Sequence, residues 1–203
     1  KVKIGGLSVP VSEGGIIACV TTDVNITKEL LDKALVCDYE DTYNMICSSW
    51  AGSANDSVFA LASGMAGNKI IDSENSDYEA FCAALKYINL YLAKKMTDEE
   101  LSQFFEVNVI NAQDKKSAVL ISKAVAHSGS TEVYRILHII GKQDAEFNPE
   151  IIDITLKSPE GSIPLVKNGL AANRETIMPD SKKINLVIDL QGGNYSATAF
   201  GTR

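Results

Sequence analysis

The chain has 203 residues and a formal net charge of −7, a length that suits one large domain or two small ones with a buried core. Its apolar fraction of 45% and charged fraction of 22% are ordinary for a globular protein. The acidic balance argues against a nucleic-acid partner, because phosphate binding needs a basic surface. No apolar run approaches the roughly 20 residues of a membrane helix, so we expect no membrane partner. Because the chain opens on Lys1 without a signal peptide, we expect a trimmed, processed or partial product.

The cysteines and histidines form no pattern that predicts a metal or a triad. They are Cys19, Cys37, Cys47, Cys82, His127 and His138. The sequence has no C-x-x-C pair, so we expect neither a zinc site nor another cofactor. Cys19 and Cys82 lie in apolar runs and are predicted to be buried free thiols, which favours a reduced, cytoplasmic setting. Neither histidine has a serine or cysteine partner at a spacing that would indicate a triad.

Short strands and helices alternate in the first half of the chain. Residues 16–20 form an apolar run that predicts a buried strand. Asn25 or Thr27 is expected to cap a helix whose apolar side carries Leu30, Leu31, Ala34 and Leu35. Residues 43–50 are mixed but favour strand. Residues 58–62 suit a strand or a helix equally, since a short apolar run cannot distinguish the two.

A long helix is predicted over residues 76–96. Ser76 and Glu79 have the spacing of a capping box, in which each side chain bonds the other residue's backbone N–H. The i, i+3, i+4, i+7 spacing of a buried face is followed by Tyr78, Phe81, Cys82, Leu85, Ile88 and Leu92. Thr97 and Glu100 repeat the capping-box pattern, so we expect a second short helix that runs through Leu101.

The second half predicts one mixed sheet with helices on one face. Strands are expected at residues 105–110, 151–156, 162–166, 184–190 and 195–200, and helices at residues 114–127 and 132–140. Phe105, Val107 and Val109 should face the core, and Gly192-Gly193-Asn194 should form a hairpin turn. The fold class is therefore α/β with α+β layers. We divide it near Phe104 into a first subdomain, residues 1–104, and a C-terminal subdomain, residues 105–203.

Several short segments match, in order and spacing, the motifs of one enzyme family. They are Lys3-Ile4-Gly5-Gly6, Thr21-Thr22-Asp23, Ser53-Ala54-Asn55-Asp56-Ser57-Val58, Phe105-Glu106-Val107, Arg135-Ile136-Leu137, and Asp189-Leu190 with Ser196-Ala197-Thr198-Ala199. The chain thus resembles, over almost its whole length, the β chain of the ornithine acetyltransferases, the glutamate N-acetyltransferases of arginine biosynthesis. The resemblance implies a two-domain α/β architecture of mixed sheets packed with helices. It also implies a heteromeric, oligomeric assembly.

The resemblance breaks at the residue that should carry the chemistry. In the family, an Ala-Thr peptide bond before the first β-chain strand cuts itself, and the freed threonine accepts the acyl group. Gly14 and Gly15 stand at these positions, and a glycine has no atom that can attack an amide. Ser12 and Thr21 are the nearby hydroxyls that could replace it, although Thr21 would need an activating base.

Three acidic or amide residues are further candidates for the site. Glu99 corresponds by position to a family glutamate beside the substrate, but the glycines and the lysine around that glutamate are missing. A solvated residue in the first turn of a helix is the simpler interpretation of Glu99. Asn55 and Asp56 could line a substrate pocket, or they could bond their own backbone in an Asx-type turn.

Three functional hypotheses remain open. The chain could transfer an acetyl group from N-acetylornithine to glutamate. It could instead be a non-catalytic subunit or scaffold of the same fold that binds an amino-acid-type small molecule. In the third hypothesis, a separate N-terminal (α-like) chain supplies the half of the family that is missing here, including its oxyanion-binding threonines, and it could also supply the nucleophile. The chain also stops before the family's C-terminal segment, and we expect it to be inactive by itself.

Overall fold

The computed structural model describes residues 1–11, 14–48, 52–99, 104–172, 181 and 183–202. The chain divides into two compact units, Lys1–Glu99 and Glu100–Arg203. Our subdomain boundary at residue 104 stays a prediction, because compactness alone does not define a domain. Over the described ranges, no helix combines the length and apolar character needed to cross a membrane.

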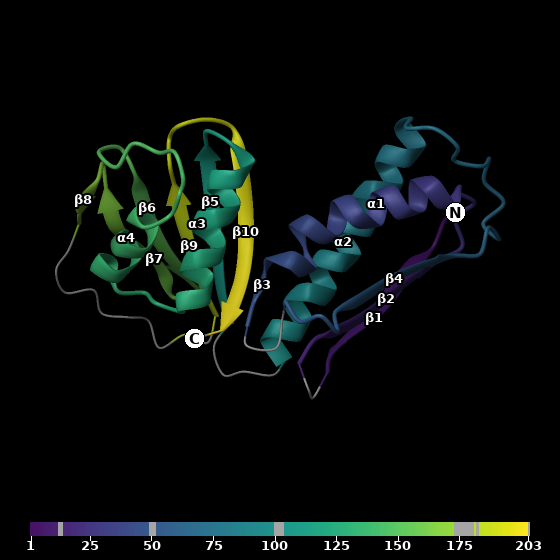
Figure 1. The fold of residues 1–203 in the computed structure, drawn as a ribbon, viewed down its shortest axis with the longest axis horizontal. Helices are drawn as coiled ribbons and strands as arrows, with labels where there is room; N and C mark the ends of the chain where they lie inside the picture. Colours follow the sequence, from purple (N-terminus) through teal and green to yellow (C-terminus); the bar gives the residue numbers. More distant parts are fainter. Residues whose placement is uncertain (12–13, 49–51, 100–103, 173–180, 182, 203) are drawn as a thin grey trace. The chain divides into compact units, whose positions relative to one another are not determined.

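The first unit is a layer of strands with two helices on one side (Figure 1). Its strands are β1 (Ile4–Pro10), β2 (Ile16–Thr22) and β4 (Ser57–Ala62), in the order β1-β2-β4. The β1 and β2 strands are antiparallel, whereas β2 and β4 are parallel. The helices are α1 (Lys28–Asp41) and α2 (Ser76–Glu99). The strand predicted at residues 16–20 is confirmed, and residues 58–62 are a strand.

The β1 strand was not predicted, because its glycines and its proline have low strand propensity. The structure gives one of these glycines a packing role. A Cβ on Gly6 would lie 2.7 Å from the carbonyl oxygen of Cys19 and 3.1 Å from Cδ1 of Leu92. Ser8 Oγ also donates to the carbonyl oxygen of Leu92 at 3.1 Å. Small residues therefore let β1 lie close against α2.

The predictions for the N-terminal caps of α1 and α2 are partly confirmed. Thr27 caps α1 by accepting a hydrogen bond from Leu30 N at 3.4 Å, which confirms one of the two candidates. The cap of α2 is Asn75, whose Oδ1 accepts from the N–H groups of Asp77 and Tyr78 at 3.0 and 3.1 Å. The predicted capping box at Ser76 is wrong because Ser76 is already the first helical residue, one position past the cap.

The segments on either side of α2 also differ from expectation. Thr97 lies inside α2, where its hydroxyl donates to the carbonyl oxygen of Lys94 at 2.9 Å. It therefore does not start a second helix, and Glu100 and Leu101 lie outside the described residues. The segment at 43–50 forms a 3-10 turn, Tyr43–Met45, followed by the two-residue strand β3 (Ile46–Cys47). Trp50 lies outside the described part.

Cys19 and Cys82 are free but only partly buried, contrary to prediction.

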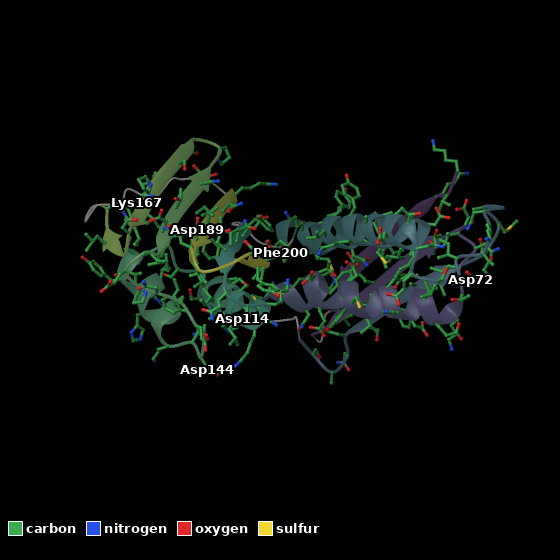
Figure 2. All side chains as sticks on the ribbon, turned by 90° about the horizontal axis from the view of Figure 1, so that it is seen from above. Asp72, Asp114, Asp144, Lys167, Asp189 and Phe200 are labelled. Carbon is green, nitrogen blue, oxygen red and sulfur yellow. The ribbon has the colours of Figure 1, made fainter. Side chains whose placement is uncertain are left out.

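The second unit is a mixed sheet with helices on one face (Figure 1). Its elements are β5 (Phe104–Ala112), α3 (Lys115–Ser128), α4 (Val133–Gly141), β6 (Asp153–Ser158), β7 (Gly161–Lys167), β8 (Leu170–Ala171), β9 (Lys183–Asp189) and β10 (Tyr195–Thr202). Within the unit the strands follow the order β10-β5-β9-β6-β7-β8. Phe105, Val107 and Val109 are buried as predicted. Asp114 caps α3, at the start of the helix in Figure 2.

The predicted hairpin between the last two strands is wrong. The β5 strand lies between β9 and β10, parallel to β9 and antiparallel to β10. The connection therefore crosses the end of β5, where a Cβ on Gly193 would lie 2.4 Å from the carbonyl oxygen of Ala112. In this turn, Gln191 and not a glycine adopts the left-handed backbone conformation, with φ of 50°.

A polar network lies buried between α1 and α2. Asn89 Nδ2 donates to Asp38 Oδ2 at 2.5 Å, and the Tyr43 hydroxyl donates to Asn89 Oδ1 at 3.1 Å. Oδ1 of Asp38 is buried without a hydrogen-bond partner among the described residues. Burial raises the pKa of the Asp38 carboxyl, while the bond from Asn89 and the charge of Lys86 act in the opposite direction.

This network predicts a pH dependence of stability. Because the folded-state pKa of Asp38 is raised, the folded state binds the proton more tightly, and stability falls as the pH rises through that pKa. Asp38→Asn should flatten the dependence of the urea midpoint on pH above about pH 4, the ordinary pKa of an aspartate. The control is Asp32→Asn, at an exposed position on the same helix. Equal slopes for Asp38→Asn and the unmodified chain would contradict this assignment.

Candidate functional site

The expected nucleophile position lies at the tip of the β1–β2 hairpin. Val11 N donates to the carbonyl oxygen of Gly15 at 3.0 Å, and Gly14 N donates to the carbonyl oxygen of Val11 at 2.9 Å. Gly14 and Gly15 have φ of 90° and 124°, which residues with a Cβ rarely adopt. The backbone of this tip therefore suits glycine.

A loop before β4 is tied to the tip by the side chains of Asn55 and Asp56. Asp56 Oδ1 accepts from Ile16 N at 2.8 Å, and its Oδ2 accepts from Gly52 N at 3.0 Å. Asn55 Nδ2 donates to the carbonyl oxygen of Gly14 at 3.5 Å. Ile16 is buried, so its N–H needs a partner. The Asp56 carboxylate supplies that partner and holds the loop against the start of β2.

The loop itself is closed by Ser53. Its carbonyl oxygen accepts from Asp56 N at 3.1 Å, and its Oγ accepts from Asn55 N at 3.2 Å. Of the two interpretations left open for Asn55 and Asp56, the Asx-type turn is not the one that closes this loop, because a serine hydroxyl makes the local bond. This arrangement leaves the Asn55 amide exposed and directs the Asp56 carboxylate to the hairpin.

Residue 15 has little room for a side chain. A Cβ built on Gly15 would lie 3.1 Å from the Cβ of Asn55, 3.3 Å from the carbonyl carbon of Asn55 and 3.4 Å from Oδ1 of Asp56. A side chain at residue 15 would therefore require Asn55 to shift slightly. Since φ is also unfavourable there, the tip is shaped around the glycine.

Of the other candidates, only Thr21 can be placed relative to this group. Thr21 is six residues farther along β2, about 20 Å away at roughly 3.3 Å per residue. It is exposed, and no described side chain hydrogen-bonds to its hydroxyl. It borders an open groove of about 570 Å³ at that end of the sheet, together with Lys3 and Asp23. Glu99 is the last residue of α2, but its side chain, like all of Ser12, lies outside the described part.

Two features of the tip could not be predicted from sequence. Tyr39 on α1 is close enough for the Asp56 charge to act on it: burial raises the pKa of Tyr39, and the carboxylates of Asp56 and Glu40 add to this rise. The N–H groups of Ile16 and Gly52 are bound by a side chain, and main-chain groups carry no sequence signal.

Among the described residues at the tip, the side chains offer hydrogen bonding. Asn55 offers an exposed amide, and Asp56 offers a carboxylate whose two oxygens already accept main-chain bonds. Neither Gly14 nor Gly15 brings an oxygen, sulfur or nitrogen side-chain atom. Across the described residues, no three or more His, Cys, Asp or Glu side chains are placed to share a metal ion.

The bridge made by Asp56 can be tested by its removal. Asp56→Ala should lower the free energy of unfolding by roughly 2 kcal/mol, because two N–H groups lose a charged acceptor. Asn55→Ala removes only a long hydrogen bond of an exposed side chain, so it should change this free energy by less than about 0.5 kcal/mol. Urea unfolding measures both, and equal losses for the two variants would contradict the role of Asp56.

Known proteins resemble this chain along most of its length. The ArgJ family model matches residues 9–203. The arginine biosynthesis bifunctional protein ArgJ of Caldanaerobacter subterraneus is 33% identical over 201 residues, covering 92% of this chain and 50% of that protein. The glutamate N-acetyltransferase of Methanocaldococcus jannaschii is 32% identical over 206 residues, with 92% and 50% covered. The chain thus spans about half the length of these curated relatives.

A solved structure agrees with the fold. The crystal structure of the arginine biosynthesis bifunctional protein ArgJ from Bacillus halodurans has a TM-score of 0.77 and 28% identity, over 90% of this chain and 91% of that chain. This likeness confirms the expected architecture of mixed sheets packed with helices. The resemblance noted from the short motifs is also confirmed, and the chain belongs to the ArgJ family.

Proposed function

We propose that the chain is part of an ornithine acetyltransferase assembly that moves acetyl groups between N-acetylornithine and glutamate in arginine biosynthesis, in the cytoplasm. The main support is membership of the ArgJ family along residues 9–203, with relatives named for arginine biosynthesis and for glutamate N-acetylation. By itself the chain is inactive. Gly15, at the position of the family's nucleophile, supports this second part.

The chemistry explains why Gly15 matters. In transfer through an acyl-enzyme, a protein hydroxyl oxygen bonds to the acetyl carbon while the C–N bond of N-acetylornithine breaks and ornithine leaves with the proton. The amine of glutamate then attacks the ester and regenerates the hydroxyl. Both steps need an oxygen on the protein, and the loss of a covalent nucleophile commonly removes orders of magnitude in rate.

The loop and the tip supply the proposed substrate contacts. Asn55 is exposed beside Gly14, so its amide can hydrogen-bond to the carboxylate or the amide of an amino-acid-type ligand. Asp56, the next residue, is partly buried and carries a charge. Its bond to the main chain of the hairpin fixes the position of Asn55. Ser12, Thr21 and Glu99 are weaker candidates for a catalytic role.

We propose that the assembly contains a second polypeptide. The relatives are about twice as long as the part matched here, so we propose that a separate N-terminal (α-like) chain supplies the remainder. A non-catalytic, amino-acid-binding subunit is the alternative function. It is favoured by the tight contact of Asn55 with Gly15, which leaves little space for an acyl-carrying side chain.

An acetyl-transfer assay tests the proposal directly. The purified chain, incubated with N-acetylornithine and glutamate, should give no N-acetylglutamate above the buffer rate and no acetyl adduct by intact mass. Ornithine, glutamate or their acetyl forms should raise its melting temperature, because a ligand at about 100 times its Kd adds about 2.7 kcal/mol to stability. An acetyl ester on Ser12 or Thr21 would contradict inactivity, and no shift with any of the four ligands would contradict binding.

Restoring a hydroxyl at residue 15 is a second test. Gly15→Thr should lower the free energy of unfolding by about 1–3 kcal/mol, because it combines an unfavourable φ with contact against Asn55. Gly5→Thr is the matched control, since a Cβ there meets nothing within 4 Å and threonine suits a strand. Neither variant should transfer acetyl groups when alone. If Gly15→Thr were as stable as Gly5→Thr and became acetylated, the tip would not be shaped against a nucleophile.

A further inference from the structure

Two ion pairs define how α1 and α2 are aligned. The helices lie side by side in Figure 1 and in Figure 2. Lys33 Nζ lies 2.5 Å from Oε1 of Glu74, which comes just before α2. Farther along, Lys86 Nζ lies 2.8 Å from Asp41 Oδ2. Because the residue numbers rise together in the two pairs, the helices run in the same direction.

This alignment places one cysteine of each helix in the same turn. Residues four positions apart lie on the same side of a helix. Cys37 comes four residues before Asp41 on α1, and Cys82 comes four residues before Lys86 on α2. The two cysteines are therefore one turn to the N-terminal side of the Asp41–Lys86 pair, on facing sides of the two helices.

The electrostatics of the surrounding residues agree with this placement. The pKa of Lys33 is raised mainly by its hydrogen bond to Glu74. Negative charge at Cys37 and at Cys82 adds to that rise. Burial raises the pKa of the Cys82 thiol, its bond with Tyr78 lowers it, and the charge of Cys37 raises it further. Since charges act in this way on groups that are near them, the two thiols belong to one cluster.

The helices are close enough for a covalent bond between facing side chains. Asn89 Nδ2 is 2.5 Å from Asp38 Oδ2, although both side chains are short. Ala34, on the same side of α1 as Asp38, is buried. A disulfide needs Cα atoms within about 7 Å of each other. Packed helices have axes about 8–10 Å apart and Cα atoms about 2.3 Å from each axis, so facing positions reach this range.

The two thiols differ in their access to solvent. Both are free, but Cys37 is exposed whereas Cys82 is partly buried. A dissolved oxidant therefore reaches Cys37 more easily. Redox-active pairs commonly combine an accessible thiol, which is oxidised first, with a neighbouring thiol that resolves the product. Cys37 and Cys82 have the exposure that these two roles require.

We propose that Cys37 and Cys82 are a peroxide-sensitive pair, which forms a reversible disulfide between α1 and α2. In the first step, the Cys37 thiolate attacks one oxygen of hydrogen peroxide, the O–O bond breaks, and hydroxide leaves. In the second step, the Cys82 sulfur attacks the sulfur of the resulting sulfenic acid, the S–O bond breaks, and water leaves with the Cys82 proton. One peroxide is reduced to water and two thiols are oxidised.

The resting state of this pair is the dithiol. In a reducing compartment disulfides are usually transient, and those that form often report an oxidant. A small thiol reductant reverses the reaction by thiol–disulfide exchange through a mixed disulfide. The pair is separate from the acetyl-transfer chemistry of the proposed function, because none of the proposed substrate contacts involves either cysteine.

Thiol counting and peptide mapping on the whole chain test this proposal. Treatment with a slight excess of hydrogen peroxide should remove two of the four thiols, as counted by alkylation in urea. The intact mass should fall by about 2 Da, the two hydrogens lost in a disulfide. Cleavage after Asp and Glu separates Cys37 from Cys47, because Glu40 and Asp41 lie between them. The expected product joins the peptides of Cys37 and Cys82, and dithiothreitol should release them.

Serine variants provide the controls. Cys37→Ser and Cys82→Ser should each abolish the cross-link, and Cys82→Ala repeats the second test if Cys82→Ser fails to fold. Cys19→Ser, at the other partly buried cysteine, should retain it. The proposal is overturned if the treated chain keeps four thiols or if the bond joins other cysteines or two chains. It is also overturned if Cys37 proceeds to sulfinic acid while Cys82 stays a thiol.

Discussion

The carboxylate of Asp56 determines the local structure of the candidate site. Its two oxygens bind the N–H groups of Ile16 and Gly52, residues that are far apart in the sequence. One bond satisfies a buried donor at the start of β2, and the other holds the loop before β4. Because β4 continues directly from this loop and pairs in parallel with β2, the same carboxylate aligns the loop, the hairpin tip and the central strand. Asn55 is placed against Gly15 as a consequence.

This placement changes how the missing nucleophile is understood. A glycine that had merely replaced a threonine would leave a space where the side chain had been. Here a Cβ on Gly15 would lie 3.1 Å from the Cβ of Asn55, and φ is 124°. Backbone and neighbour are both adapted to glycine. The contact with Asn55 and the φ of Gly15 therefore both favour glycine at this position.

Sequence periodicity was enough to predict most helices and the core of the second unit. The spacing of Phe105, Val107 and Val109 describes which side of β5 is buried, because that information is local. The predicted β9–β10 hairpin is wrong because β5 lies between these two strands. No local sequence pattern encodes the pairing of β5 with both of them. The predicted position of the α2 cap is wrong by one residue, since Asn75 and Ser76 are both good capping residues. At the site, the motif around Asp56 was visible, but its bonds to main-chain groups were not.

The face of the β1-β2-β4 sheet that points away from the helices is more apolar than the packing within the first unit requires. The near-continuous apolar run of β2 predicted a buried strand, and one face is indeed buried under the helices. Ile17 on the other face remains exposed, as do Leu7 and Phe59 on the neighbouring strands. A sheet that needed only one buried face could have carried polar side chains there at little cost in stability. The packing within the first unit therefore does not account for the apolar residues on this face.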